Sequence, residues 1–332
     1  MLGLTKLAPG PGSVGLSERP EREPGPGEAL LEVRAAGICG TDLHIEAGAY
    51  PSVPPVTMGH EVSGVVLAGA GPAGARVVSE TYFSTCGTCS FCLAARPNLC
   101  LERKSIGTHV DGAFAPRLVV PAANLHPIPD WLPDPAAALA EPVACVCNSL
   151  YDPAAVAEGD AVLVIGPGAI GLLAAQVARA AGGRVHVLGT GRDGARLELA
   201  RRLGFDASAG ESVPGTQSPF DVVVECSGSG SGITTGLLAT RRRGSFVQMG
   251  LRGAPVTVPF DEICFRELTV TSGFASTPAS WLRALGLIEA RQVELEPLVT
   301  EVVPLAEWER AFSASRNAEG VKYVLDPQAG AP

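Results

Sequence analysis

Long apolar runs and basic clusters are the two features that this chain most clearly lacks. No stretch approaches the ~20 apolar residues of a membrane-spanning helix, and the first twelve residues have neither the charged nor the apolar region of a signal peptide. The net charge is −9, with Arg241-Arg242-Arg243 as the one basic cluster, which argues against nucleic acid as a partner. We therefore expect a cytoplasmic protein with no membrane or nucleic-acid partner.

Aromatic residues are also scarce, at 5% of the chain, whereas 40 glycines and 28 prolines occur without a repeat. This composition predicts many turns and short loops. A length of 332 residues exceeds one typical hydrophobic core, so about two domains are expected. The nine cysteines are clustered, and in a reducing cytoplasm clustered cysteines favour metal binding over disulfides.

Four of the nine cysteines form one motif of the pattern C-x2-C-x2-C-x7-C. They are Cys86, Cys89, Cys92 and Cys100. Thiols at this spacing can converge on one tetrahedral ion, and zinc is the ion that takes four thiolates in a closed shell. We predict a structural zinc site in this lobe, residues 86–100. Two disulfides or four idle thiols are the alternatives.

A second group of possible metal ligands is found in the sequence before and after this lobe. Its members are Cys39, His60, Glu61 and Glu141. Cysteine, histidine and carboxylate ligands can bind zinc while leaving one position open for water or substrate, which is the pattern of a catalytic site. Each residue alone would be uninformative, but together they predict a catalytic zinc.

The pattern of the sequence changes near Pro153. Before it, short apolar or alternating segments such as Leu30–Arg34 and Val62–Val66 are separated by glycine and proline. This predicts an irregular, antiparallel, β-barrel-like domain. After it, short apolar runs alternate with helical patterns, which predicts a doubly wound parallel sheet of the Rossmann type and hence an α/β protein.

The expected parallel strands set the domain boundaries. These strands are Ala161–Ile165, Val185–Leu188, Asp221–Glu225, Ser245–Met249 and Leu268–Thr271. We place the dinucleotide-binding domain at 147–272. The catalytic zinc domain then comprises 1–146 and 273–332, because 321–325 reads as a strand that rejoins the first domain.

The run Ala161–Ile165 leads directly into a G-x-G-x-x-G turn and then into a helical pattern. The turn consists of Gly166, Pro167, Gly168, Ala169, Ile170 and Gly171. In this context the first glycine allows the tight turn, the second lets the backbone approach a pyrophosphate, and the third lets the helix pack against the strand. We predict that these residues bind NAD or NADP at the helix N-terminus. A glycine-rich turn without a ligand is the alternative.

The end of the second parallel strand bears on the choice between NAD and NADP. The acidic residue that usually binds the ribose of NAD is replaced there by Thr190 or Gly191, and Arg192 follows. A guanidinium can pair with a 2′-phosphate, so we expect NADP to be used at least as well as NAD. Two alternatives stay open: Arg192 is a solvated loop residue, or a different register lets Asp193 bind the ribose hydroxyls.

Together these motifs resemble those of the zinc-dependent medium-chain dehydrogenases/reductases, most of all the branch of the polyol (sorbitol-type) and threonine dehydrogenases. The resemblance covers essentially the whole chain, with Gly37–His44, Gly59–Glu61, the cysteine lobe, Glu141–Pro142 and the glycine turn in the family's order. It implies an enzyme, a zinc- and NAD(P)-dependent alcohol or polyol dehydrogenase with one catalytic and one structural zinc per chain. It also implies a homo-oligomer, either a dimer or a tetramer.

The resemblance further implies roles for single residues. Cys39 and His60 match ligands of the family's catalytic zinc, and Glu61 matches a ligand used in the polyol branch. Glu141 occupies a position that is cysteine in the alcohol dehydrogenase branch and glutamate in the polyol branch, where it binds the metal directly or through water.

Thr41 and His44 match the family's proton-relay positions. A glutamate-bearing zinc site with few aromatic residues suits a polyhydroxylated substrate, so we expect a secondary hydroxyl to be oxidised to a ketone. A zinc alcohol dehydrogenase for simple primary alcohols and aldehydes, and a non-catalytic redox-sensing metalloprotein, are the alternatives. A zinc-free quinone or enoyl reductase is disfavoured, because such enzymes lack both sets of metal ligands.

Overall fold

A computed structural model describes residues 1–210 and 220–329 of the chain. The chain divides into unit 1, which comprises Met1–Glu141 and Leu295–Pro332, and unit 2, which comprises Pro142–Glu294. Helix α4 (Ala140–Tyr151) carries the chain from the first unit to the second. The second boundary lies at 294/295 rather than at the expected 272/273.

The segment 273–294 groups with unit 2 because helix α9 (Pro278–Glu289) and the loop after it are tied to that unit. The side chain of Gln176 donates a hydrogen bond to the carbonyl of Glu294 at 3.1 Å and accepts one from the Glu294 amide at 2.7 Å. In the segment that precedes α9, the carbonyls of Phe274 and Ala275 accept hydrogen bonds from the Asn148 side chain.

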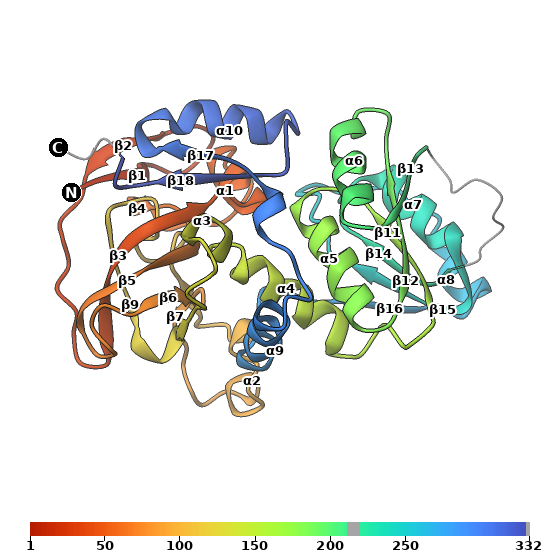
Figure 1. Ribbon diagram of the computed structural model, residues 1–332, viewed down its shortest axis with the longest axis horizontal. Helices are drawn as coiled ribbons and strands as arrows, with labels where there is room; N and C mark the ends of the chain where they lie inside the picture. The colour runs from red at the N-terminus through yellow and green to blue at the C-terminus, as the bar shows by residue number, and fades with distance from the viewer. Residues whose placement is uncertain (211–219, 330–332) are drawn as a thin grey trace. The chain divides into compact units, whose positions relative to one another are not determined.

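Unit 1 is mainly antiparallel β-structure (Figure 1). Its strands are β1 (Leu2–Lys6), β2 (Val14–Glu18), β3 (Glu28–Gly37), β4 (Val56–Thr57), β5 (Glu61–Gly69), β6 (Arg76–Ser79), β7 (Tyr82–Ser84), β8 (Lys104–Ser105), β9 (Arg117–Pro121), β10 (Leu125–Pro127), β17 (Val299–Pro304) and β18 (Lys322–Asp326). The main sheet has the order β10-β6-β5-β3-β18-β17, with β9 also pairing with β3, while β2-β1-β4 and β7-β8 form smaller sheets. The expected strand near 321–325 is thus β18, beside β3.

The helices of unit 1 are short. They are α1 (Gly40–Glu46), α2 (Ser90–Leu93), α3 (Asp134–Ala137) and α10 (Trp308–Arg316), with 3-10 helices at Pro97–Leu99, Ala122–Asn124, Glu296–Leu298 and Leu305–Glu307. Along most of β3, buried residues alternate with half-buried ones, which is the pattern of a strand with only one face on a core.

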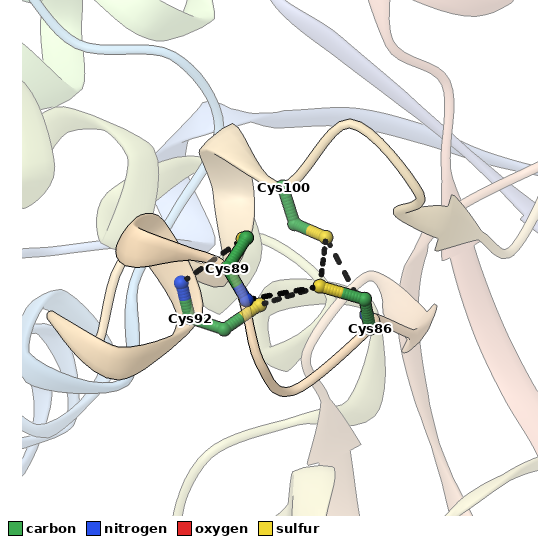
Figure 2. A group of neighbouring side chains, drawn as sticks. All are labelled: Cys86, Cys89, Cys92 and Cys100. Carbon is green, nitrogen blue, oxygen red and sulfur yellow. Dashed lines mark hydrogen bonds between the residues drawn. The ribbon is translucent and has the colours of Figure 1, made fainter.

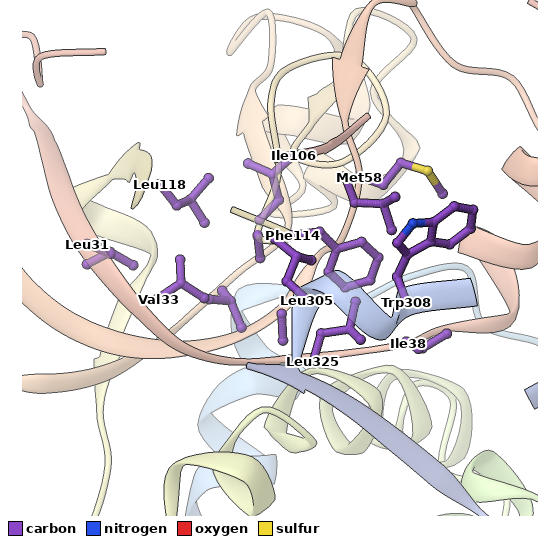
Figure 3. Packing of buried hydrophobic residues seen from close by; sticks show 14 of the residues in the cluster. Leu31, Val33, Ile38, Met58, Ile106, Phe114, Leu118, Leu305, Trp308 and Leu325 are labelled. Carbon is purple, nitrogen blue, oxygen red and sulfur yellow. The ribbon is translucent and has the colours of Figure 1, made fainter. Parts of the chain in front are cut away.

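The core of unit 1 joins the C-terminal segment to the N-terminal strands (Figure 3). From α10, the Trp308 and Phe312 rings meet edge to face at 5.3 Å, and Phe312 meets Phe114 at 6.2 Å. Leu31 from β3 and Leu325 from β18 belong to the same cluster. Burial of these side chains holds β18 against β3, and that placement brings Lys322 to the candidate active site.

Unit 2 contains a six-stranded parallel sheet of order β13-β12-β11-β14-β15-β16. The strands are β11 (Ala161–Ile165), β12 (Arg184–Gly189), β13 (Asp206–Ala209), β14 (Phe220–Glu225), β15 (Thr240–Gln248) and β16 (Thr269–Ser272). Its other helices are α5 (Ala169–Ala180), α6 (Gly194–Arg202), α7 (Gly230–Ala239) and α8 (Asp261–Phe265). Helices α5 and α6 lie on one face of the sheet and α7 on the other (Figure 1).

This sheet confirms the predicted fold class, an α/β protein with a Rossmann sheet and a separate β-rich domain. The buried positions of β11 run consecutively rather than alternating, as expected for a strand covered on both faces. The strand order reverses between β11 and β14, and in such folds ligands bind at that point, beyond the carboxyl ends of the strands. No helix in the described part of the chain is long and apolar enough to cross a membrane.

Candidate active site, metal centres and dinucleotide turn

The four cysteines of the lobe converge on one point (Figure 2). Their sulfur atoms all lie within 4.8 Å of one another, with Cys86 Sγ 3.9 Å from Cys92 Sγ and 3.6 Å from Cys100 Sγ. A tetrahedral zinc with bonds of about 2.3 Å separates its sulfur ligands by about 3.8 Å. All nine cysteines are free thiols, so the disulfide alternative is wrong, and the residues fit a zinc ion.

Backbone amides support this arrangement of sulfurs. The Cys89 amide donates to Cys86 Sγ at 3.3 Å, and the Cys86 amide donates to Cys100 Sγ at 3.4 Å. Amides of Thr88 and Cys89 lower the pKa of Cys86 to about 6, whereas burial raises the pKa of Cys92 to about 11. Without a cation only part of the quartet is therefore ionised at neutral pH, and a metal ion is what allows four thiolates together.

The second ligand group forms where α1 begins and β5 begins. Cys39 is the N-cap residue of α1, and His60 and Glu61 lead into β5. Their ligand atoms lie within 4.8 Å of one another. Glu141, in the first turn of α4, is 6% exposed and close enough to act electrostatically on His60, but it is not one of this mutually close group.

Two glycines are required for this convergence. A Cβ atom at Gly37 would lie 2.1 Å from Glu61 Oε2, and one at Gly59 would lie 2.5 Å from the Phe114 ring. Gly59 also has φ of +89°, a conformation that favours glycine. These packing requirements explain Gly37 and Gly59, the glycines that begin the two motifs.

Asp42 was not assigned a role from the sequence, yet it connects the two ligand segments. Its carboxylate is fully buried and accepts hydrogen bonds from the amides of Cys39 at 2.9 Å and Gly59 at 3.3 Å. Its Oδ1 lies 3.8 Å from His60 Nδ1. Burial acts to lower the pKa of His60, but the charges of Cys39, Asp42 and Glu141 hold that pKa well above its usual range. The surroundings of His60 therefore carry excess negative charge.

Lys322 is a second functional candidate that sequence reasoning missed. From β18, its Nζ donates to both carboxylate oxygens of Glu61 at 2.8 Å and to the carbonyl of Ile38 at 3.0 Å. Both side chains are at most 5% exposed. Burial acts to lower the pKa of Lys322, but Glu61 and then Cys39 raise it above its usual value. Glu61 is therefore paired with an ammonium group in addition to lying among the candidate metal ligands.

Thr41 and His44 lie one turn apart on α1, and both are partly exposed. Residues three apart share one face of a helix. Because Cys39 caps the same helix, the relay candidates are attached rigidly to one of the metal ligands.

In unit 2 the glycine turn has the form that its pattern predicts. A Cβ at Gly171 would lie 1.9 Å from the carbonyl oxygen of Gly166, and one at Gly166 would lie 2.9 Å from the Ser227 amide nitrogen. Gly168 has open space around its Cβ position and caps α5 without any side-chain hydrogen bond. The first and third glycines are needed for packing, and the second leaves helix amides available to a phosphate.

At the end of β12, the Asp193 carboxylate is turned back into its own loop. Its Oδ2 accepts hydrogen bonds from the amide and hydroxyl of Thr190 at 2.8 and 2.7 Å, and its Oδ1 lies 3.7 Å from Arg196 Nη1. Arg192 is exposed. Gly189 packs against Pro167, so this loop adjoins the glycine turn.

The fold and these sites define a metal-dependent oxidoreductase with a dinucleotide-binding domain. Residues 25–130 match the alcohol dehydrogenase GroES-like domain, and residues 169–290 match the zinc-binding dehydrogenase domain. A sorbitol dehydrogenase of Halalkalibacterium halodurans is 37% identical over 98% of this chain and 99% of its own. An L-threonine 3-dehydrogenase of Deinococcus radiodurans is 32% identical, with 98% of each chain covered.

A solved structure agrees with these sequence matches. The zinc-binding dehydrogenase of Sinorhizobium meliloti, bound to NADP, has 31% identity and a TM-score of 0.88, covering 98% of this chain and 99% of its own. The chain belongs to the zinc-dependent medium-chain dehydrogenases, in the branch of the sorbitol and threonine dehydrogenases. The expected resemblance is confirmed, and the protein is a zinc- and NAD(P)-dependent dehydrogenase.

The two metal centres should respond differently to substitution. Cys89→Ser should remove about one zinc per chain and lower the melting temperature by about 10 °C or more, because a closed structural site contributes several kcal/mol to folding. Cys39→Ser should remove the other zinc and abolish turnover while the melting temperature stays close to that of the wild type. Elemental analysis and thermal melting measure both effects, and the opposite pattern would show that the two centres are assigned the wrong way round.

The Lys322–Glu61 pair should matter most when no metal is bound. Lys322→Met should destabilise the metal-free protein by about 3–5 kcal/mol, because it leaves a buried carboxylate without its cation. The double variant Lys322→Met/Glu61→Gln should recover much of this loss, and Lys322→Arg serves as the charge-preserving control. Urea unfolding measures the free energies, and equal losses in the single and double variants would refute the pairing.

Proposed function

We propose that this dehydrogenase oxidises the secondary hydroxyl of a small polyol, or of a similar hydroxylated compound, to a ketone. The observation that carries the proposal is the ligand group itself. Cys39 and His60 lie with Glu61, and the buried Glu141 lies close to His60. Carboxylates in place of further cysteines make the site polar and charged, which suits a substrate with several hydroxyl groups. Similarity to a sorbitol dehydrogenase supports the same substrate class.

We assign Cys39, His60 and one glutamate as the protein ligands of the catalytic zinc, with Glu141 acting directly or through water. The bound zinc would supply Lewis-acid polarisation of the substrate hydroxyl, and the nicotinamide would supply the hydride acceptor. Asp42 fixes the Cys39 amide by a hydrogen bond and lies 3.8 Å from the His60 ring, and such surrounding contacts support metal ligands. Lys322 holds the Glu61 carboxylate in place.

Thr41 and His44 would carry the proton that leaves the substrate hydroxyl. The Thr41 hydroxyl can accept one hydrogen bond and donate another. His44 follows it on the same face of α1, and its imidazole can exchange a proton with solvent. Relay through these two side chains lets the proton depart without water entering beside the hydride-transfer step.

A substrate panel tests the proposal. Small polyols should be oxidised at a secondary carbon, with product analysis finding a ketone, and turnover should fall at least 100-fold in Cys39→Ser and His60→Ala because the polarising metal is lost. Absorbance of NAD(P)H gives the rates. Turnover of long-chain or aromatic primary alcohols alone would contradict the proposal and favour the simple alcohol dehydrogenase alternative.

We also propose that NADP is used at least as well as NAD, with Arg192 binding the 2′-phosphate. The Asp193 carboxylate is already engaged by Thr190 and lies near Arg196, which leaves it poorly placed to bind ribose hydroxyls. Thr190 and Gly191 add no negative charge that would repel a phosphate. The NADP complex of the Sinorhizobium meliloti relative is consistent with this choice.

Arg192→Ala should weaken NADP binding about 10-fold and leave NAD binding nearly unchanged, because one charge-assisted hydrogen bond is worth about 1.5–3 kcal/mol. Thr190→Asp should improve NAD relative to NADP. Calorimetric titration gives the dissociation constants. A wild-type protein that strongly prefers NAD, and loses that preference in Asp193→Ala, would establish Asp193 as the ribose ligand instead.

We further propose that the chain forms a homo-oligomer, a dimer or tetramer, and works in the cytoplasm. Its thiol-rich ligand sets suit a reducing compartment. Exposed apolar side chains in unit 2, including Phe265 on α8 and Val270 on the edge strand β16, offer a surface for a second copy. Sedimentation analysis should give a mass at least twice that of one chain, and a monomer at micromolar concentration would refute this.

A further inference from the structure

Glu225, the last residue of β14, is a buried carboxylate that the mechanism above does not use. It is 0% exposed. Its Oε1 accepts hydrogen bonds from the amide of Ser227 at 2.8 Å and from the Ser227 hydroxyl, and its Oε2 accepts from the Gly228 amide at 3.0 Å and from Gln248 Nε2 at 2.8 Å. Within residues 1–210 and 220–329, no salt bridge involves this carboxylate.

Two glycines make room for this carboxylate, and a third is needed for the turn that binds it. A Cβ at Gly250 would lie 2.8 Å from Glu225 Oε2 and 2.1 Å from the Gly228 nitrogen, and a Cβ at Gly232 would lie 2.8 Å from Glu225 Oε1. Gly228 has φ of +64°, and its own Cβ would lie 2.7 Å from the carbonyl oxygen of Leu251. Burial of a charge without an ionic partner is costly, so a loop built around such a charge indicates a role beyond stability.

The location of this loop suggests that role. Glu225 ends β14, directly beside β11, where the strand order of the sheet reverses. The Cys226 amide donates to the Ile165 carbonyl at 2.8 Å, and the Gly166 backbone touches Ser227. The loop therefore lies next to the glycine turn. In a doubly wound sheet the β11–β13 half holds the adenosine end of the dinucleotide, so the β14–β16 half faces the nicotinamide end.

The hydrogen bonds to Glu225 also fix what the loop presents to a ligand. In a trans peptide the N–H and C=O groups point in opposite directions. The Ser227 and Gly228 amides point toward the carboxylate, so the carbonyls of Cys226 and Ser227 point away from it. Carbonyl oxygens are acceptors for the carboxamide and ribose hydroxyls of a nicotinamide nucleoside. The nearby negative charge also favours the oxidised ring, which is cationic, over the neutral reduced ring.

We propose that Glu225 is the positioning residue for the nicotinamide half of the cofactor. Its carboxylate holds the Ser227–Gly228 turn in the binding conformation, and its charge favours the oxidised ring. This inference rests on the NAD(P)-dependent function stated above. It concerns unit 2 alone, and its consequences can be measured without substrate turnover.

Fragment binding separates this role from general support of the fold. ADP, with a 2′-phosphate if NADP is preferred, contains the adenosine and the pyrophosphate but neither the second ribose nor the nicotinamide. In Glu225→Gln, the dissociation constant of the oxidised dinucleotide should rise about 10-fold, that of the reduced form should rise less, and that of the ADP fragment should stay within about 2-fold. Calorimetry measures all three, and thermal melting reports on the fold.

Matched variants keep the test decisive. Asp221→Asn removes a carboxylate from the amino end of the same strand and should change none of the three constants. Ser227 is exposed, and Ser227→Ala removes the hydroxyl that donates to Glu225 and accepts from the Ser229 amide. The dissociation constants should rise by about 3-fold for the oxidised dinucleotide and by less for the other two ligands, which provides the test if Glu225→Gln does not fold.

Equal weakening of all three ligands, or no weakening of any, would overturn the positioning role. Failure of the wild type to bind either the dinucleotide or the ADP fragment would instead overturn the cofactor assignment itself. The two failures are therefore distinguishable.

Discussion

Excess buried negative charge is the constraint on which the candidate active site of unit 1 depends. Asp42, Glu61 and Glu141 are 0, 1 and 6% exposed, and the Cys39 thiol lies among them. Lys322 and His60 are the nearby groups that can carry positive charge, and the pKa values of both are raised although burial acts to lower them. A site with this balance favours a cation, and a mixture of thiolate, imidazole and carboxylate ligands suits zinc.

The contacts show that the three carboxylates have different roles. Asp42 is bound to the amides of Cys39 and Gly59, so it ties together the two segments that supply ligands. Glu61 is paired with Lys322, so its buried charge is balanced, and it lies beside the other candidate metal ligands, Cys39 and His60. Glu141 lies in the first turn of α4, and its charge raises the pKa of His60. Removal of any one of them changes the charge balance that the other groups experience.

Both units contain a buried carboxylate that can approach the backbone only because glycines lie beside it. Gly37 leaves space for Glu61 in unit 1, and Gly232 and Gly250 leave space for Glu225 in unit 2. Glu61 begins β5 and accepts hydrogen bonds from the Lys322 ammonium, whereas Glu225 ends β14 and accepts four hydrogen bonds from three residues. Such carboxylates hold their surroundings rigidly, because every donor pointed at them would be unsatisfied if they moved. Rigid surroundings are what a metal ligand and a cofactor-binding turn require.

The sequence by itself determined the features whose residues lie close together in the chain. The cysteine quartet spans residues 86–100 and the glycine turn six residues, so spacing alone predicts a shared ion or a phosphate-binding turn. The consecutive apolar residues of β11 and the alternation in β3 likewise predicted the two kinds of sheet. Tertiary structure decided the rest. Lys322 and Glu61 are 261 positions apart in the sequence, and the pairing of β18 with β3 brings them together. No local sequence pattern indicates such a pairing. The orientation of Asp193 and the donors around Glu225 depend on backbone conformation and on neighbouring strands, which residue types and spacing do not specify.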